Sequence, residues 1–507
     1  MTRADESQTA VCVDFGSTWT KALHVDLDTG EVLGTTSAPT SLDEVMEAYD
    51  ACLATLAEQD SRAADAEILA CSSAGGGLRI AVVGNEELVT AEAGRRVALS
   101  SGGKVVAVIA TGSREAESDL GATLSFTTPD LVLLTGGTDG GNRQAVIDAA
   151  GQLASAGWTG PVVYAGNQEA RDEVAAILTD NPLRTCDNVV PKIGVLAPQS
   201  AREAVRETFL EHVIGGKGLS QRAEFTEIVQ GATPDVVLQG VETLAEVLGE
   251  DVVVVDVGGA TTDVHSVVRP DPEAEHVREE VVAVTPVTRT VEGDLGMRWS
   301  ATTTLDAANH ADPSLAESDL TGEAEHRRNN PGWLPWTEQD KDIDELLARI
   351  AISTALQRHA GRSRVVLSPG GKVIERTGTD LRRVGVVIGS GGVLRHGRPR
   401  IEERVMRWST RGGWQLPETT GARSSGETTG ARSSGELARP LAPSEGVTAR
   451  SAELDRPLAP SEGVTARSAE APRRTVDSDY VLAAVGLLAR SHPDAARTLA
   501  THLTPSR

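Results

Sequence analysis

The sequence predicts an α/β protein whose core is built twice along the chain, with a further α/β subdomain inserted into its first half. Three observations support this. Two similar motifs of an acid, glycines and hydroxyl residues each lie between apolar runs. A glycine cluster follows a third apolar run, and strand-like and helical runs alternate between these points. A chain of 507 residues is also too long for one compact core.

Composition excludes several classes of protein. The net charge of −25 argues against a nucleic-acid or anionic-membrane surface, because both require clustered positive charge. No apolar stretch approaches the length of a membrane span, and the first residues, MTRADESQTA, lack the features of a signal peptide. The four cysteines lie far apart with no CxxC pair, which excludes a zinc ribbon and argues against a disulfide framework. We therefore expect a cytoplasmic protein.

The first forty residues predict three strands, Val11–Asp14, Lys21–Leu27 and Glu31–Thr35, joined by short turns. A helix should follow from Ser41, with Glu44 completing a capping box.

From about Ile68 to Ile214, strand-like runs alternate with helical ones, which predicts a mostly parallel, doubly wound sheet. This is more sheet than half of the duplicated core needs, so we expect an inserted subdomain at about 80–215. The predicted strands are Ile68–Cys71, Ile80–Val83, Val105–Ala110, Leu131–Thr135, Val162–Ala165 and Asn188–Val195, and the helices are Gly141–Ala156, Glu169–Thr179 and Ser200–Val213.

The second half begins with a strong helix that leads into a buried strand. The predicted elements are the helices Pro234–Leu248 and Asp340–His359, the strands Val252–Val255, Val264–Val268 and Val384–Ile388, and the closing helices Asp479–Ala489 and Pro493–His502. We expect the first half of the core, with its insertion, to span 1–235, and the second half 236–416. The closing helices would occupy 475–507.

Between the second half and the closing helices lie two pairs of identical repeats. ETTGARSSG occurs at Glu418–Gly426 and Glu427–Gly435, and RPLAPSEGVTARSAE at Arg439–Glu453 and Arg456–Glu470. They lack the apolar periodicity that a solenoid repeat needs. Their composition predicts a disordered linker over 417–474, without a catalytic role.

The first chemical motif is Asp14-Phe15-Gly16-Ser17-Thr18, at the turn between two predicted strands. Gly16 would allow the backbone to approach a phosphate, and Ser17 and Thr18 would add donors. Asp14 could hold magnesium at the strand end. Alone, this pattern is also compatible with an ordinary hairpin.

The second motif, Asp256–Asp263, repeats the design with Gly258, Gly259, Thr261 and Thr262 at its turn. Two such hairpins predict a fold that holds a triphosphate and its metal from both sides. Asp263 is a second carboxylate, available for the metal or an attacking water, or simply a solvated charge at a strand end.

The third motif is the glycine cluster Gly389, Ser390, Gly391 and Gly392, after the strand Val384–Ile388. Glycines at such a turn let a purine and its ribose lie against the backbone.

Together the three motifs resemble the phosphate-one, phosphate-two and adenosine motifs of the superfamily that contains actin, sugar kinases and heat-shock chaperone ATPases. The resemblance implies a duplicated actin-like (ribonuclease H-like) core that binds ATP and magnesium. It assigns Asp14 and Asp256 to the metal, and Asp14, Asp256 and Asp263 to catalysis. The nucleotide would contact Gly16, Ser17, Thr18, Lys21, Gly258, Gly259, Thr261, Thr262, Gly389, Ser390, Gly391 and Gly392.

Within that superfamily the chain is similar to the MutL-type accessory proteins of glutamate mutase. The similarity is carried by VDFGSTWTKA (13–22), LLTGGTDGGN (133–142), DVGGATTDVHS (256–266), RTVEGDLGMRWS (289–300) and VIGSGGVLRH (387–396). It covers Val11–Leu416 and resumes at Tyr480–Ala489, whereas the duplicated linker departs from the family.

This resemblance implies a chaperone-like partner of an adenosylcobalamin-dependent carbon-skeleton mutase. Such a reactivase would use ATP to exchange damaged cobalamin for intact cofactor, with slow turnover. The chain has no DxHxxG cobalamin-ligand pattern, so we do not expect it to be the mutase.

Two alternatives on the same fold stay open. One is a small-molecule enzyme, either a kinase, which could recruit Asp263 or Glu292 as its base, or an ATP-dependent hydantoinase-like hydrolase. The other is an iron–sulfur activase, for which Cys71 and Cys186 lie in the plausible region but in no recognisable ligand motif. The glycine-rich turn Thr135–Asn142 could bind an anion or a partner, but a structural role is favoured.

Overall fold

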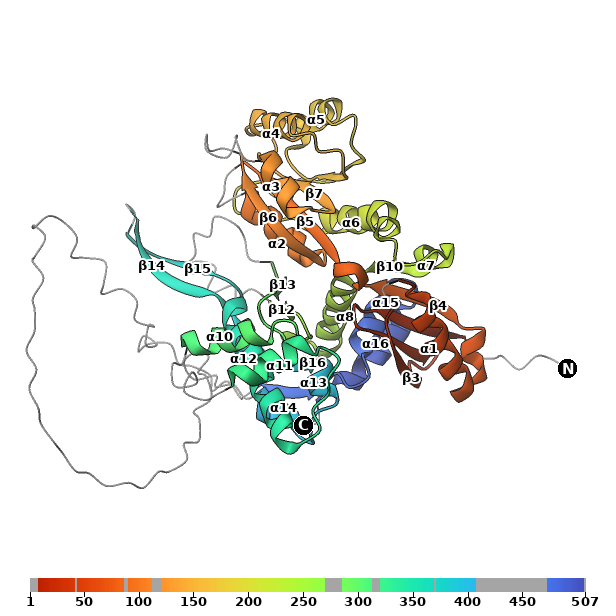
Figure 1. Cartoon of the computed structure of the whole chain (residues 1–507). Helices are drawn as coiled ribbons and strands as arrows, with labels where there is room; N and C mark the ends of the chain where they lie inside the picture. The colour runs from red at the N-terminus through yellow and green to blue at the C-terminus, as the bar shows by residue number, and fades with distance from the viewer. Residues whose placement is uncertain are drawn as a thin grey trace, which may run out of the picture.

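The computed structural model describes residues 8–41, 43–85, 90–111, 120–269, 285–311, 320–368, 371–406 and 472–505. The repeats expected to form a linker lie outside these residues. Figure 1 shows two lobes of the core with a third body above them, and a hairpin of β14 (Arg362–Ser368) and β15 (Gly371–Thr377) projecting to one side.

The first lobe is built on a five-stranded sheet. Its strands are β1 (Thr9–Phe15), β2 (Trp19–Asp26), β3 (Val32–Pro39), β4 (Glu67–Ser72) and β10 (Val229–Ala232), in the order β10-β4-β1-β2-β3. The first three strands are antiparallel, and β4 and β10 are added in parallel. Helix α1 (Met46–Gln59) covers this sheet through Tyr49, Cys52 and Leu56.

The second lobe repeats this arrangement. Its strands are β11 (Val252–Val257), β12 (Thr262–Val267), β13 (Val287–Glu292), β16 (Val386–Ser390) and β17 (Arg473–Val476), in the order β13-β12-β11-β16-β17. Again the first three strands are antiparallel and the last two parallel. The two sheets therefore have one topology, which confirms the predicted duplication and actin-like fold.

Helices complete the second lobe. The long α12 (Glu338–Ala360) packs on its sheet through Leu347, Ala351 and Ala355, and begins with a capping box of Thr337 and Asp340. The others are α10 (Ala301–Ala311), α11 (Thr321–Asn329), α13 (Gly392–Arg395) and α14 (Ile401–Val405).

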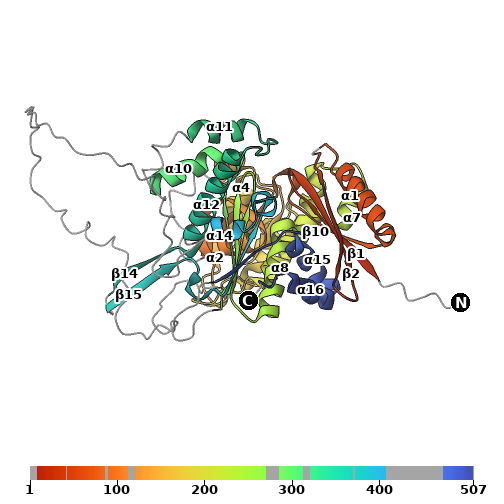
Figure 2. The same cartoon turned by 90° about the horizontal axis from the view of Figure 1, so that it is seen from below.

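Two equivalent helices hold the lobes together. Helix α8 (Thr233–Leu248) follows the last strand of the first lobe, and α15 (Val481–Ser491) follows the last strand of the second. Both views show them between the lobes, with α16 (Pro493–Ala500) alongside (Figures 1 and 2). A Cβ on Gly240 would lie 2.1 Å from the carbonyl oxygen of Leu482, and one on Gly486 would lie 1.9 Å from that of Val236. Glycine at both positions thus permits the close crossing.

The inserted subdomain lies between β4 and β10 and has its own sheet. All five strands are parallel, in the order β6-β5-β7-β8-β9. They are β5 (Leu78–Gly84), β6 (Gly103–Ala110), β7 (Leu131–Leu134), β8 (Val162–Tyr164) and β9 (Leu183–Thr185). The helices are α2 (Glu92–Ser100), α3 (Leu120–Thr127), α4 (Gln144–Ser155), α5 (Arg171–Ile177) and α6 (Gln199–Thr208), and α7 (Ala223–Ile228) leads back to β10. This is the strand order of flavodoxin-like sheets, in which the direction of strand addition reverses, here between β5 and β7.

Two local expectations are wrong. The last strand of the insertion is β9, not Asn188–Val195, which forms a loop. The helix expected from Ser41 begins at Met46, and Glu44 instead accepts hydrogen bonds from the backbone of Met46 and Gln221. Five further strands were not anticipated, namely β10, β13, β14, β15 and β17, and β17 begins within the range assigned to the linker.

Candidate functional site

The first motif forms the turn between β1 and β2. A Cβ on Gly16 would lie 2.5 Å from the carbonyl oxygen of Trp19, so the tight turn requires glycine. Ser17 and Thr18 are exposed at its tip. Asp14, at the end of β1, is 7% exposed and pairs across the ladder with Lys21, whose Nζ lies 3.3 Å from its carboxylate.

Asp14 has two further partners in the first lobe, one on α8 and one on β4. Thr233, the first residue of α8, donates a hydrogen bond of 2.6 Å from Oγ1 to Asp14 Oδ1. The Cys71 thiol of β4 also donates to this oxygen at 3.7 Å. The carboxylate is therefore fixed from three neighbouring elements before any ligand binds.

The second motif forms the equivalent turn between β11 and β12. Asp256 faces Asp263 across the ladder, and Asp263 Oδ2 accepts a hydrogen bond from Thr261 Oγ1. Gly258 and Gly259 lie in the turn. Thr262 is fully buried and its hydroxyl donates to the carbonyl of Leu295, so this hydroxyl contributes to packing.

The segment Leu295–Ser300 packs against this second turn and donates hydrogen bonds to its carbonyl oxygens. The amides of Met297 and Arg298 donate to the carbonyls of Gly258 and Gly259, and Ser300 Oγ donates to the carbonyl of Ala260. Carbonyl oxygens that would repel a phosphate are thus already paired. The end of the RTVEGDLGMRWS segment therefore contributes directly to the second hairpin turn.

The third motif lies beside Asp256. Gly389 and Ser390 end β16, Gly391 has φ of 101°, and Gly392 begins α13. A Cβ on Gly391 would lie 3.0 Å from Asp256 Oδ1 and 2.2 Å from the carbonyl oxygen of Val257. A Cβ on Gly392 would meet nothing within 4 Å, so this turn offers open backbone to a ligand.

The charges of the two hairpins act on one another. Burial raises the pKa of Asp256 to about 6. Lys21 opposes this rise, whereas three nearby carboxylates add to it: Asp263, Asp14 and Asp477. Burial lowers the pKa of Lys21, but Asp14, Tyr480 and Asp256 outweigh it and raise that pKa above its usual value. The charged side chains of the two motifs therefore lie close enough to shift one another's pKa.

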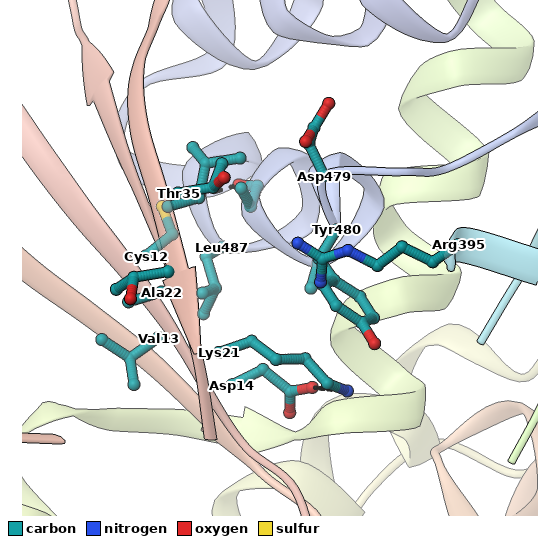
Figure 3. Close-up of a pocket in the computed structure, with 14 residues that line it drawn as sticks. Cys12, Val13, Asp14, Lys21, Ala22, Thr35, Arg395, Asp479, Tyr480 and Leu487 are labelled. Atoms are coloured by element: carbon teal, nitrogen blue, oxygen red, sulfur yellow. Dashed lines mark hydrogen bonds and ion pairs between the residues drawn. The ribbon is translucent and has the colours of Figure 1, made fainter. Parts of the chain in front are cut away.

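Tyr480 joins the two lobes beside this site. Its ring centroid lies 4.1 Å from Lys21 Nζ and 4.1 Å from the guanidinium carbon of Arg395, which is on α13 (Figure 3). These residues line a cavity between β1, β2 and α15. Tyr480 has φ of 58°, a conformation that costs free energy outside glycine. The stacked ring contacts therefore offset a local backbone strain.

Sequence reasoning missed Thr233, Asp477, Tyr480 and Arg395. Asp477 follows β17 as Thr233 follows β10, and it caps α15 by accepting from the amides of Val481 and Leu482. Burial raises the pKa of Asp477 to about 6. Thr233 and Asp477 share the place directly after the last strand of a sheet, whereas Tyr480 and Arg395 are brought to the site only by tertiary contacts.

The glycine-rich turn Thr135–Asn142 is held by side chains of its own subdomain. Asn188 donates to the carbonyl of Gly137, and Asn167 donates to that of Thr138. Asn142 accepts from the amides of Gln144 and Ala145 at the start of α4. These contacts support a structural role, because they fix the turn internally and the amides of Gln144 and Ala145 at the start of the following helix already have a partner.

The remaining candidates are distributed over the molecule. Glu292 and Asp294 both pair with Arg358, at 2.7 Å. Cys71 lies in the first lobe's sheet, whereas Cys186 follows β9 in the insertion, and both are buried. In the part of the chain that the structure describes, no group of three or more His, Cys, Asp or Glu residues is arranged to hold a metal. None of the described helices is long and apolar enough to span a bilayer.

The repeated strand order and paired hairpins define the class as an actin-like ATPase fold. A model of the family described as MutL protein matches residues 10–424, so the chain belongs to this family. It is 35% identical over 402 residues to Protein MutL of Clostridium tetanomorphum, covering 76% of this chain and 86% of the relative.

Solved structures resemble the chain more weakly. The ATP-dependent caprolactamase of Pseudomonas jessenii has a TM-score of 0.33 and 14% identity, covering 78% of this chain and 67% of that one. Nucleotide-free acetone carboxylase has a TM-score of 0.29 and 16% identity, and the match covers 58% of this chain and 48% of that one. Component A of (R)-2-hydroxyglutaryl-CoA dehydratase from Acidaminococcus fermentans has a TM-score of 0.24 and 10% identity, and the match covers 76% of this chain and 84% of that one.

Proposed function

We propose that this protein binds ATP and magnesium between its two hairpins, and uses them to reactivate or assemble an adenosylcobalamin-dependent glutamate mutase or a related mutase. The observation that carries the nucleotide site is the equivalence of Asp14 and Asp256. Each lies at the end of the first strand of its sheet, the two sheets have the same topology, and the charges of the two carboxylates interact. Membership of the MutL family supports the partner.

The residues present fit a nucleotide with magnesium. Magnesium is commonly held by one or two carboxylates together with phosphate oxygens, and Asp14 and Asp256 supply these carboxylates. The glycine turns at Gly16 and Gly391 have no space for a side chain, as expected of turns that support a phosphate and a nucleoside. The metal would neutralise phosphate charge.

The other side chains have distinct roles in this proposal. Lys21 would meet phosphate oxygens, with Ser17, Thr18 and the amides around Gly258 and Gly259. Thr261 would lie beside the phosphates, and Asp263 would orient the attacking water. The turn Gly389–Gly392 would contact the adenosine. Hydrolysis would be slow, because the output is a change of conformation rather than a product.

The test is ATP hydrolysis by the purified protein, with and without the cobalamin-inactivated mutase, while cobalamin release is followed. We expect the mutase to stimulate hydrolysis and ATP to drive release, with ADP as the control nucleotide. If ATP binds but neither effect occurs, the reactivase proposal is wrong, and a small-molecule kinase or hydrolase becomes the better account. If ATP does not bind, the nucleotide site is wrong as well.

A further inference from the structure

Arg289 of β13 lies between the candidate site and the inserted subdomain. Its Nη2 and Nε donate to Asp263 Oδ1 at 2.6 and 3.1 Å. The Arg289 side chain is 4% exposed, so water weakens this pair little. The planar guanidinium fixes the orientation of the carboxylate it holds.

The other end of the same guanidinium contacts the insertion. Arg289 Nη1 donates to the carbonyls of Leu99 and Gly103, both at 3.2 Å. These carbonyls belong to the last turn of α2 and the start of β6. A cation at the C-terminus of a helix is stabilised by the helix dipole. One side chain therefore caps α2 and holds Asp263.

The turn Ser101–Gly103 also touches the first lobe. Gly102 has φ of 78°, and a Cβ there would lie 2.7 Å from the backbone nitrogen of Asp235 in the first turn of α8. That turn begins with Thr233, which binds Asp14. The loop between α2 and β6 thus lies against α8, whose Thr233 binds Asp14, and its ends accept hydrogen bonds from Arg289, which binds Asp263.

Helix α2 connects this turn to the opposite end of the inserted sheet, where the carboxyl end of β7 lies. Its nine residues span about 13 Å at the usual helical rise. Just before the helix, the carbonyl of Thr90 accepts from Thr135 Oγ1, and a Cβ on Gly94 would lie 3.2 Å from the Thr135 side chain. Thr135 begins the glycine-rich turn that follows β7, where the strand order reverses.

We propose that Arg289 is a positioning residue that holds Asp263 and transmits the nucleotide state of the proposed site through α2 to the glycine-rich turn Thr135–Asn142 of the insertion. This inference rests on the proposed nucleotide site. When the lobes move, a rigid guanidinium shared between a carboxylate and two carbonyls cannot keep both sets of bonds unless α2 moves with it. The carboxylate end and the helix end are therefore coupled.

The experiment is amide hydrogen exchange of the full chain, with and without saturating magnesium-ATP. The reporters are the amides of Ser101 and Gly102, which donate to the carbonyls of Val97 and Leu99. We expect nucleotide to slow their exchange by about fivefold or more, the lower range of ordinary couplings between sites. Arg289→Gln and Asp263→Asn should each abolish the slowing, at nucleotide concentrations shown by titration to saturate that variant.

Arg269→Gln is the matched control. Arg269 also caps a helix C-terminus, donating to the carbonyls of Gly249 and Ala245 at the end of α8, but it does not contact Asp263. This variant should keep the slowing. If Arg289→Gln does not fold, Asp263→Asn decides the question, because it leaves Arg289 in place. Retained slowing in Arg289→Gln or Asp263→Asn, or loss in Arg269→Gln, overturns the inference, as does unchanged exchange in nucleotide-bound native protein. A native protein that binds no nucleotide overturns the proposed function itself.

Discussion

Lys21 and Asp263 occupy the same position in the two halves of the core. Each lies on the second strand of its sheet, directly across the ladder from the aspartate that ends the first strand, Asp14 or Asp256. The duplicated hairpins therefore differ in charge: one pairs an acid with a base, and the other places two acids together. This difference contributes to the raised pKa of Asp256.

Replacing either strand-end aspartate should weaken binding of magnesium-ATP. Asp14→Ala and Asp256→Ala each remove a proposed metal ligand, and we expect at least about a tenfold rise in Kd, equivalent to about 1.4 kcal/mol. Titration calorimetry measures this, with circular dichroism to confirm folding. Asp28→Ala, at the exposed turn after β2, is the control and should bind normally. Unchanged affinity in both site variants would contradict the assignment.

Binding of magnesium-ATP should strengthen as the pH rises through about 6. The pKa of Asp256 is raised to about 6, so its carboxyl is protonated below that pH and charged above it. Only the charged form is a good metal ligand. Because the nucleotide titrates too, the same series with Asp256→Asn is subtracted. A native series that matches the variant at every pH would show that Asp256 does not control binding.

The ring of Tyr480, rather than its hydroxyl, should stabilise the contact between the lobes. Tyr480→Phe keeps the aromatic face between Lys21 and Arg395, whereas Tyr480→Leu removes it. Each of the two cation–π contacts contributes about 0.5–2 kcal/mol, so Tyr480→Leu should lower the free energy of unfolding by about 1–4 kcal/mol. Denaturant unfolding distinguishes the two. Equal losses in both variants would instead assign the effect to the hydroxyl.

The crossing of α8 and α15 should not tolerate a side chain. Gly486→Ala places a Cβ 1.9 Å from the carbonyl oxygen of Val236, so the helices must separate. We expect a loss of about 2 kcal/mol or more in thermal unfolding, as for other overpacked sites. The control is Gly151→Ala in α4, where a Cβ meets nothing within 4 Å and the higher helix propensity of alanine should stabilise the protein. A neutral Gly486→Ala would contradict the close crossing.

Much of the fold could be predicted because its strands are apolar and end at recognisable turns. The runs around Asp14 and Asp256 are buried strands as expected, and their topology repeats. By contrast, β17 reads RRTV and is only partly buried, so no apolar pattern marks it. Asn188–Val195 looks strand-like, but Val189 and Val190 enter the core from a loop that Asn188 fixes.

The candidate site was predictable where its chemistry is local to one motif. The residues that complete it come from distant parts of the chain, and their roles depend on tertiary contacts. Arg289 is an ordinary strand arginine in sequence, and the role proposed for it follows from the helix end at Leu99 that the fold places beside it. Glu44 shows the converse, because a contact with Gln221 replaced the expected capping box.

The most direct test of the account is titration of the native protein with ATP, in the presence of magnesium and with the magnesium chelated. We expect saturable binding of one nucleotide per chain that weakens when magnesium is removed, because Asp14 and Asp256 would reach the phosphates through the metal. Absence of binding at millimolar ATP, or equal affinity with and without magnesium, would contradict it.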